Sequence, residues 1–451
     1  MMSALSLSTI AEKTGGQVAQ DVTFSGVCTD TRSIQHGDLF VALNGENFNG
    51  NLFVNDAANS GAVAAVVSDT VDTSIPCLQV EDSRLALGLI AKANRQQFSG
   101  PLVGLTGSAG KTSTKEMVAS ILSGVGEVLA TRGNLNNEIG VPQTLLQLET
   151  SHDYAVVEMG ASKKGDIAYL MQFVEPTISV LTNAMPVHIE GFGSLEAIGK
   201  TKGEIFEGLV VDDTAVINLD DKFYQQWREQ AGAASIVTFS KSHVEADFYA
   251  SDIALLPAGL TSFILHSPVG NVSISLSVLG EHNVMNALAA AAAAMAAGAG
   301  LDDIKKGLEK VKPVNGRLKA FSQSDQTIID DTYNASPGSM KAAIDVLAGF
   351  AGVRCLIMGT MSELGDMAIS GHQEVAEYAK EKGIEQLVVV GEYAGLVAQA
   401  FGKDCATYNE MSELLTVINS IEAATILIKG SRSARMERAV QALLANNGRQ
   451  Q

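Results

Sequence analysis

The sequence predicts an α/β fold in three domains, and three observations support this class. The chain has 451 residues, a length that fits two to four domains. Apolar residues make up 46% of it, which excludes a mostly disordered chain. Short apolar runs alternate with helical stretches, and Gly-Pro and Lys-Pro pairs interrupt this pattern twice. We therefore expect a small N-terminal α/β domain over residues 1–98, a central domain over 99–312 and a C-terminal domain over 313–451.

The N-terminal part alternates short strands and helices. Four runs predict strands, namely VCTD (27–30), DLFVAL (38–43), AVAAVVS (62–68) and PCLQV (76–80). Asp82 can accept hydrogen bonds from the first amides of a helix that is predicted over residues 83–98.

The central part repeats a strand–helix pattern. Its predicted strands include PLVGLT (101–106), YAVVEM (154–159), TISVLTN (177–183) and AVINLDD (215–221). Such runs indicate buried parallel strands, and ligand sites form at the carboxyl ends of these strands. A β-rich stretch over 261–280 then precedes the Ala-rich segment 287–300. That segment has 14 residues, whereas a bilayer needs about 20, so it predicts a helix packed on a sheet.

The C-terminal part is expected to be a second, Rossmann-like α/β unit. Four more runs predict strands, namely TIIDD (327–331), RCLIMGT (354–360), QLVVVG (386–391) and TILIKG (425–430). Helical stretches such as residues 372–381 lie between them.

Charge and cysteine usage narrow the functional class. Lys and Arg number 31 against 50 Asp and Glu, giving a formal charge of −19, which argues against non-specific binding of nucleic acid. The cysteines are widely separated and predict reduced thiols, as in a cytosolic protein. They are Cys28, Cys77, Cys355 and Cys405. The N-terminal residues lack the basic and apolar regions of a signal peptide.

The most informative motif is PLVGLTGSAGKTSTKEMVASIL at residues 101–122. An apolar strand leads into a Gly-rich turn and then into an amphipathic helix. Glycines let backbone amides surround a polyphosphate, and the helix N-terminus adds partial positive charge. The lysine of such a loop reaches the β- and γ-phosphates, and the next hydroxyl can bind Mg²⁺. Although Leu105 replaces the first glycine of the general P-loop pattern, the motif predicts a P-loop ATPase-like parallel-sheet domain. The candidate nucleotide-binding residues are Gly107, Ser108, Ala109, Gly110, Lys111, Thr112 and Ser113.

Three further side chains are candidates for the chemistry of this site. Glu158 closes an apolar strand, where a phosphate loop needs a carboxylate for Mg²⁺; a solvated acid is the alternative. His188 follows the next strand, in a loop where a surface histidine is equally expected. Lys202 lies on a predicted helix, where lysine is normally a solvated cation. It could bind a metal only if its charge were removed or reversed, as carbamylation does.

Together these residues resemble the Mur ligase family, ATP-dependent enzymes that build the peptide of bacterial cell-wall precursors. The resemblance runs along the whole chain. The segments that carry it are TGSAGKTSTK (106–115), GNLNNEIGVP (133–142), EMGA (158–161), residues 188–194, GEHNVMNA (280–287), GRL (316–318), DDTYNASP (330–337) and KGSR (429–432). In the N-terminal domain, DTR (30–32) and ALNGE (42–46) fall in the family's uridine-binding region. Lys202 matches the lysine that is carbamylated in many members.

The resemblance implies an ATP-dependent carbon–nitrogen ligase. The members it is most similar to join D-alanyl-D-alanine to UDP-N-acetylmuramoyl-tripeptide through an acyl phosphate. The implied cofactors are ATP and two Mg²⁺ ions, one bound by Thr112 and Glu158 and the other by His188 and a carbamylated Lys202. The implied catalytic residues are Lys111, Glu158, His188 and Lys202. Further implied ATP contacts are His282, Asn283, Asn286, Arg317 and Asp331. Implied substrate contacts are Thr31, Arg32, Asn44, Gly45, Asn136, Asn137, Asn334 and Lys429.

The expected enzyme is a cytoplasmic monomer that neither binds nucleic acid nor inserts into a membrane. The alternatives are another amino-acid ligase of the same family or a P-loop NTPase of a different class. The sequence also departs from the family pattern. Asn49 and Asn51 stand where the family tends to have Asp and His, Ser162 replaces Asn, and Thr360 replaces an acid. Because none of these positions lies in the phosphate loop, the expected chemistry is retained.

Overall fold

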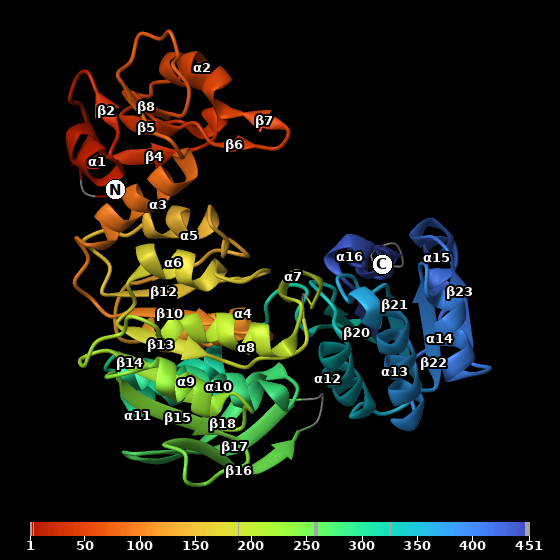
Figure 1. Cartoon of the computed structure of the whole chain (residues 1–451). Helices are drawn as coiled ribbons and strands as arrows, with labels where there is room; N and C mark the ends of the chain where they lie inside the picture. Colours follow the sequence, from red (N-terminus) through yellow and green to blue (C-terminus); the bar gives the residue numbers. More distant parts are fainter. Residues whose placement is uncertain (1, 3, 188, 257–259, 324–325, 447–451) are drawn as a thin grey trace.

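The computed structural model describes residues 2, 4–187, 189–256, 260–323 and 326–446. It contains three domains, each built around a β-sheet, which confirms the predicted fold class (Figure 1). The N-terminal domain stacks on the central domain, and the C-terminal domain stands beside the central domain. Of the helices described, none is both long enough and apolar enough to span a membrane.

The N-terminal domain has a five-stranded sheet in which only β2 is antiparallel to its neighbour. In spatial order the strands are β2 (Gln17–Val18), β9 (Cys77–Gln79), β8 (Ala64–Val67), β5 (Asp38–Val41) and β4 (Gly26–Cys28). Two short ribbons pair β1 (Leu5–Ser6) with β3 (Thr23–Phe24) and β6 (Asn44–Gly45) with β7 (Phe48–Asn49). The helices are α1 (Leu7–Thr14), α2 (Val54–Asn59) and α3 (Ser83–Arg95). As predicted, Asp82 caps α3, since its Oδ1 accepts from the Arg84 amide at 2.8 Å.

The central domain is built on a nine-stranded sheet. In spatial order its strands are β11 (Val128–Ala130), β12 (Tyr154–Glu158), β10 (Leu102–Thr106), β13 (Ile178–Leu181), β14 (Thr214–Asn218), β15 (Ser235–Ser240), β16 (Phe248–Leu255), β17 (Leu260–Ser267) and β18 (Gly270–Leu279). The strands from β11 to β16 are parallel, and the last two pair antiparallel. The segments that follow β10, β12 and β13 therefore meet at one edge of the sheet.

Helices cover both faces of the central sheet. One face carries α4 (Lys111–Leu122), α10 (His282–Ala296) and α11 (Leu301–Lys310). The other carries α5 (Gly140–Leu145), α6 (Asp166–Val174), α8 (Leu195–Gly203) and α9 (Tyr224–Gln230), with the short α7 (Ile189–Phe192) extending toward the C-terminal domain. Residues 287–294 of α10 are all buried. The Ala-rich segment is therefore a helix that packs closely on a sheet, as predicted.

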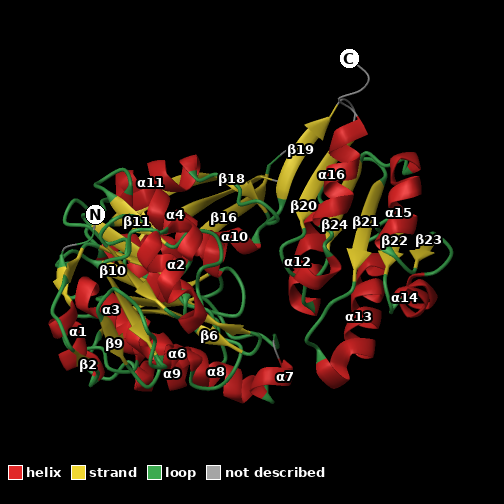
Figure 2. Cartoon of the chain, turned by 90° about the horizontal axis from the view of Figure 1, so that it is seen from above, coloured by secondary structure: helices red, strands yellow, loops and turns green. Residues whose placement is uncertain are grey.

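The C-terminal domain has a six-stranded sheet with helices on both faces (Figure 2). In spatial order its strands are β19 (Lys319–Gln323), β20 (Gln326–Asp331), β24 (Thr425–Lys429), β21 (Arg354–Gly359), β22 (Gln386–Val390) and β23 (Cys405–Tyr408). Only β19 is antiparallel to its neighbour. The helices are α12 (Pro337–Ala348), α13 (Ala368–Glu381), α14 (Ala394–Phe401), α15 (Met411–Val417) and α16 (Glu437–Asn446).

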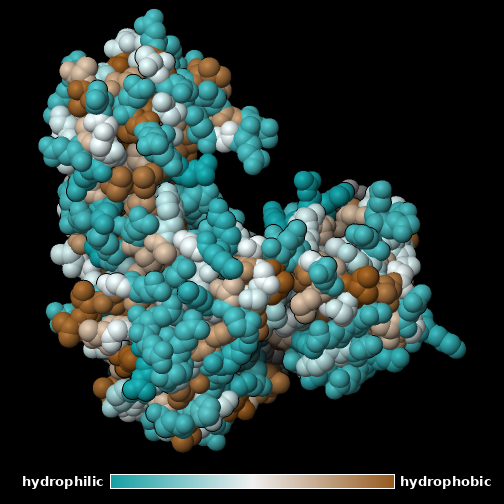
Figure 3. Space-filling model, viewed as in Figure 1, coloured by the Kyte–Doolittle hydropathy of each residue, from teal (hydrophilic) through white to brown (hydrophobic). Residues whose placement is uncertain are grey.

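Helix α3 joins the N-terminal domain to the central domain, lying above α5 and α6 in Figure 1. Gly88 meets the ring of Phe173 so closely that a Cβ would lie 2.5 Å from its Cζ. The buried Arg95 guanidinium donates to the carbonyl of Val174 at 3.0 Å and to that of Glu175 at 2.8 Å. The two domains consequently share one hydrophobic core. The C-terminal domain faces this stack across an open hollow (Figure 3).

Candidate active site

The phosphate loop joins β10 to α4 at the carboxyl edge of the central sheet. Gly110 has a φ of +81°, and a Cβ there would lie 2.2 Å from Oδ1 of Asn286, so the turn requires glycine. The first amides of α4 have no partner within the helix and can donate to an anion. Nζ of Lys111 lies 2.7 Å from the Gly107 carbonyl, so the side chain folds over the loop.

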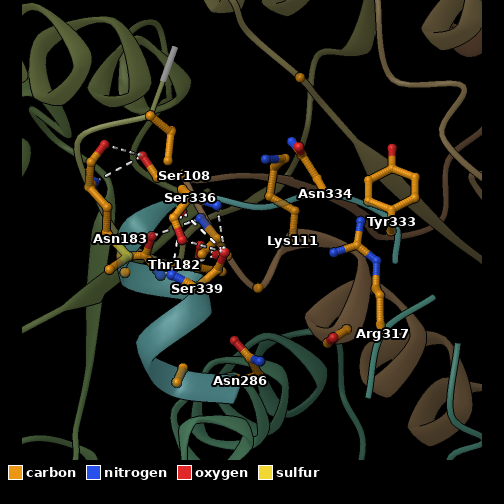
Figure 4. Close-up of a pocket in the computed structure, with 18 of the residues that line it drawn as sticks. Ser108, Lys111, Thr182, Asn183, Asn286, Arg317, Tyr333, Asn334, Ser336 and Ser339 are labelled. Carbon is orange, nitrogen blue, oxygen red and sulfur yellow. Dashed lines mark hydrogen bonds between the residues drawn. The ribbon is translucent and has the colours of Figure 1, made fainter. Parts of the chain in front are cut away.

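The charge on Lys111 is set by its surroundings. Burial lowers its pKa from the ordinary value, the nearby Glu158 carboxylate opposes this shift, and the Arg317 guanidinium adds to it. Figure 4 shows Lys111 and Arg317 in the same cavity, with the Arg317 guanidinium below the ring of Tyr333. The centre of that guanidinium lies 4.2 Å from the ring centroid. Two cationic groups thus face one space, which favours an anionic ligand.

Glu158 is buried at the end of β12, and its carboxylate is held by neutral donors. The Thr112 hydroxyl donates to Oε2 at 2.8 Å, and Nδ2 of Asn136 donates to Oε1 at 2.7 Å. Its amide donates to the hydroxyl of Thr131 at 3.0 Å. Because neither carboxylate partner is a cation, the negative charge remains available to a bound cation.

The C-terminal domain supplies residues that reach the phosphate loop. Arg317 donates from Nη2 to the Thr112 hydroxyl at 3.0 Å. Nζ of Lys429 forms a buried ion pair with Oδ2 of Asp331 at 2.6 Å and also donates to the carbonyl of Asn334 at 2.9 Å. Asp331, a predicted ATP contact, and Asn334 and Lys429, two predicted substrate contacts, are therefore connected to one another.

The start of α10 lies beside the phosphate loop. Nδ2 of Asn286 donates to Oδ1 of Asn283 at 2.8 Å, and Asn283 in turn donates to the carbonyl of Leu279 at 2.7 Å. These hydrogen bonds hold the Asn286 side chain against Gly110 of the phosphate loop.

Lys202 lies on α8 with only 1% of its surface exposed. Among the residues that the structure describes, none forms a hydrogen bond or ion pair with its Nζ, which lies 5.8 Å from the ring centroid of Phe192. Burial holds its pKa well below the ordinary value, the positive charge of Lys111 adds to this, and Asp166 opposes it. Lys202 is therefore not a solvated surface lysine. The other predicted member of this metal group, His188, lies outside the described residues.

One cavity of about 640 Å³ collects most of the candidate residues. Those that line it are Ser108, Ala109, Gly110, Lys111, Ser113, Asn136, Asn137, Glu158, His282, Asn283, Asn286, Arg317, Asp331, Asn334 and Lys429. Gly107 and Thr112 contact residues of this wall without lining it themselves. No three His, Cys, Asp or Glu side chains within the described ranges lie close enough to hold a metal ion together.

The predicted uridine contacts lie in the N-terminal domain, away from this cavity. The side chain of the exposed Arg32 donates three hydrogen bonds to the Asp30 carboxylate and its amide donates a fourth, and these bonds lower the pKa of Asp30 to about 2. Thr31 neighbours Arg32 in a short helical turn. Asn44 and Gly45 form β6, in the ribbon that extends from this domain in Figure 1. The structure does not bring these four residues together with the phosphate loop.

Sequence reasoning missed two residues that shape the site. Asn183 binds both backbone groups of Ala109. The buried Lys115 donates to the carbonyl of Thr131 at 2.7 Å and so supports the partner of the Glu158 amide. Asn183 follows β13 at the same sheet edge as Glu158, so the rule that identified Glu158 could have found it.

Comparison with known proteins assigns the family. The Mur ligase family, catalytic domain, matches residues 23–95; the Mur ligase middle domain matches 105–294; and the Mur ligase, glutamate ligase domain, matches 316–432. The UDP-N-acetylmuramoyl-tripeptide–D-alanyl-D-alanine ligase of Escherichia coli (strain K12) is 43% identical, over 99% of each chain. This chain belongs to the Mur ligase family. It is accordingly an ATP-dependent ligase that forms an amide bond.

Other Mur ligases are also similar to this chain over nearly its whole length. The ligase of the same name from Bacillus subtilis (strain 168) is 35% identical, over 96% of this chain and 97% of the relative. A crystal structure of MurF from Acinetobacter baumannii has a TM-score of 0.92 at 35% identity, covering 98% and 99% of the two chains. MurF from Thermotoga maritima in complex with ADP has a TM-score of 0.85 at 28% identity, covering 94% and 98%.

Proposed function

We propose that this Mur ligase joins D-alanyl-D-alanine to UDP-N-acetylmuramoyl-tripeptide and forms UDP-muramoyl-pentapeptide at the expense of ATP. The observation that carries the proposal is the cavity in which the phosphate loop, Glu158 and Arg317 meet. Likeness over nearly the full length to ligases named for this reaction supports the choice of substrates. We further propose that the enzyme is a cytoplasmic monomer, and we keep residues 1–98, 99–312 and 313–451 as its domains.

The reaction begins with two anions that repel each other. A carboxylate oxygen of the tripeptide attacks the γ-phosphorus of ATP, ADP leaves, and an acyl phosphate forms. The amine of D-alanyl-D-alanine then attacks the acyl carbon, phosphate leaves, and the amine loses a proton. Lys111 and Arg317 lower the Coulomb cost of bringing the anions together. The unpaired amides at the start of α4 bind the phosphates that Lys111 neutralises.

Arg317 gives the C-terminal domain a part in this site. Its guanidinium donates to Thr112, which donates in turn to Glu158. Asp331 and Lys429 hold the neighbouring backbone, since the Leu318 amide donates to Oδ1 of Asp331 at 3.2 Å. We infer that closure of this domain on the nucleotide completes the site.

The chain's residues suit two Mg²⁺ ions. Glu158 is a buried carboxylate with only neutral donors, and with Thr112 it would hold the first ion. Lys202 has a buried Nζ without a described partner beside the charge of Lys111. Carbamylation would replace this repelled cation by an anionic oxygen ligand, and with His188 it would hold the second ion. Mg²⁺ bound there supplies charge neutralisation at the transferring phosphate.

A substrate panel tests the proposal. Phosphate release is measured with ATP and Mg²⁺, with each UDP-muramoyl peptide, and with either D-alanyl-D-alanine or single amino acids. We expect release to stay near background until both UDP-tripeptide and D-alanyl-D-alanine are present. Release with UDP-dipeptide and one amino acid would assign a different ligase of the family. Rapid release without either substrate would indicate an NTPase.

A further inference from the structure

The segment of residues 182–185, which follows β13, runs alongside the phosphate loop. Each of the two segments supplies a side chain that binds the backbone of the other (Figure 4). The Ser108 hydroxyl accepts from the Met185 amide at 2.9 Å and donates to the Met185 carbonyl at 3.1 Å. The Asn183 side chain accepts from the Ala109 amide through Oδ1 at 2.9 Å and donates to the Ala109 carbonyl through Nδ2 at 3.1 Å.

Two more hydrogen bonds reinforce this pairing. The Ser108 amide donates to the Asn183 carbonyl at 2.9 Å, and the Thr182 hydroxyl donates to the Ala109 carbonyl at 2.7 Å. The segments are also in tight contact, because a Cβ on Gly107 would lie 1.9 Å from Oγ1 of Thr182. The phosphate loop is therefore ordered by side chains of segment 182–185, and not by a ladder of backbone hydrogen bonds of its own.

We propose that Ser108 and Asn183 are positioning residues that hold the phosphate loop and segment 182–185 together as one unit ready to receive nucleotide phosphates. The Ser108 hydroxyl then acts through Met185 and does not itself bind phosphate. This inference depends on the proposed function only for its activity readout, since nucleotide binding can be measured without the other substrates.

The reciprocal bonds hold the phosphate loop in place before ATP binds, so the loop does not have to be ordered by the nucleotide.

The test measures ADP binding by calorimetry and the KM for ATP in the ligase assay. The variants are Ser108→Ala, Asn183→Ala, their double variant and the isosteric Asn183→Asp. Asn419→Asp serves as the charge control, because Asn419 is an exposed residue of the C-terminal domain. Each single change should weaken ADP binding about tenfold, the loss expected for one set of buried hydrogen bonds. The melting temperature of each variant is recorded alongside.

Two results would support the inference. The double variant should bind ADP about as weakly as either single one, because both side chains act on one unit. Asn183→Asp places an oxygen against the Ala109 carbonyl, so its defect relative to wild type should shrink as the pH falls from about 8 to about 5.5, where a protonated carboxyl can donate again. Additive losses, unchanged ADP affinity, or a defect independent of pH would overturn it. Substrate-dependent phosphate release by the wild type is a separate readout, and its failure would affect the proposed function alone.

Discussion

Lys202 is a buried lysine whose Nζ has no described hydrogen-bonding partner. Such a group is unstable as an ammonium beside Lys111, and a neutral amine can react with CO₂. Lys202→Ala should lower ligase turnover by on the order of 10²–10³, the loss typical of a charged group at a transferring phosphate. Lys202→Arg should not restore activity, whereas acetate at high concentration should partly rescue Lys202→Ala. Lys200→Ala, which changes an exposed lysine on the same helix, should behave as wild type; an active Lys202→Arg enzyme would contradict the carbamate.

The lowered pKa of Lys202 also predicts how stability depends on pH. Below the pKa of Lys202 in the folded protein, the lysine is charged in both the folded and the unfolded state. The folded state then bears the full free-energy cost of burying this charge. Between the folded pKa and 10.5 the unfolded chain binds the extra proton, so the free energy of unfolding rises with pH. In CO₂-free buffer, Lys202→Met should therefore be more stable than wild type at neutral pH, and the difference should shrink as the pH approaches 10.5. Denaturant unfolding of both proteins at several pH values measures this difference.

Glu158 can be tested by removing its charge while keeping its shape. Glu158→Gln can still bind Thr112, but it no longer offers an anionic ligand to Mg²⁺. Because even indirect partners of a metal alter its affinity 10–100-fold, the Mg²⁺ concentration for half-maximal activity should rise by at least about tenfold. The measurement is a Mg²⁺ titration of ligase activity. Glu127→Gln, which changes an exposed glutamate, is the matched control. A normal Mg²⁺ requirement in Glu158→Gln would exclude Glu158 as a ligand of Mg²⁺.

At the scale of elements, the sequence predicted the phosphate loop and Glu158 because each signal is local. A strand, a Gly-rich turn and a helix are contiguous, and the end of a strand marks its own sheet edge. The place of Asn183 at the end of β13 is a local signal of the same kind, but the sequence does not identify its partner, since Ala109 lies 74 positions earlier. The departure at Asn51 is also explained only by contacts: its buried side-chain amide binds Ser68 and Asp69, and it also donates to Oδ1 of Asn49 in β7 at 3.0 Å.

The junction of the phosphate loop with α4 gives a prediction about an element. Gly110→Ala forces alanine into a left-handed conformation, which costs about 1–2 kcal/mol, and pushes its Cβ into Asn286. Gly208 has a similar φ of +84° with nothing within 4 Å, so Gly208→Ala carries the backbone cost alone. Denaturant unfolding should show a larger loss for Gly110→Ala, and only this variant should bind ADP more weakly. Equal losses in both variants would mean that the contact with Asn286 has no effect.

At the scale of the whole molecule, the sequence predicted three domains but not which of them share a core. The amphipathic pattern of α3 shows that the helix has a buried face, but the pattern does not identify what covers that face. In the structure, this face packs on α5 and α6, so one core runs from the N-terminal domain into the central domain. The cores of the C-terminal domain are nearly separate: of the residues that the structure describes, the central sheet contributes only Leu260 and Leu279 to them.

This arrangement predicts two unfolding units that differ from the three domains. Residues 1–312 should unfold together, and residues 313–451 should unfold separately, giving two transitions in calorimetry. Phe173→Ala removes a buried ring beneath α3, which costs about 3–5 kcal/mol, and should lower only the transition of the larger unit. Phe401→Ala, in the C-terminal core, should lower only the other transition.

Fragments of the chain give a second test. A fragment of residues 313–451 should fold and melt near its transition in the full chain. Residues 1–98 alone should lack a cooperative transition, because the helices that cover α3 are missing from this fragment. If residues 1–98 melted cooperatively by themselves, or if Phe173→Ala lowered both transitions equally, the shared core would not be the unit that governs unfolding.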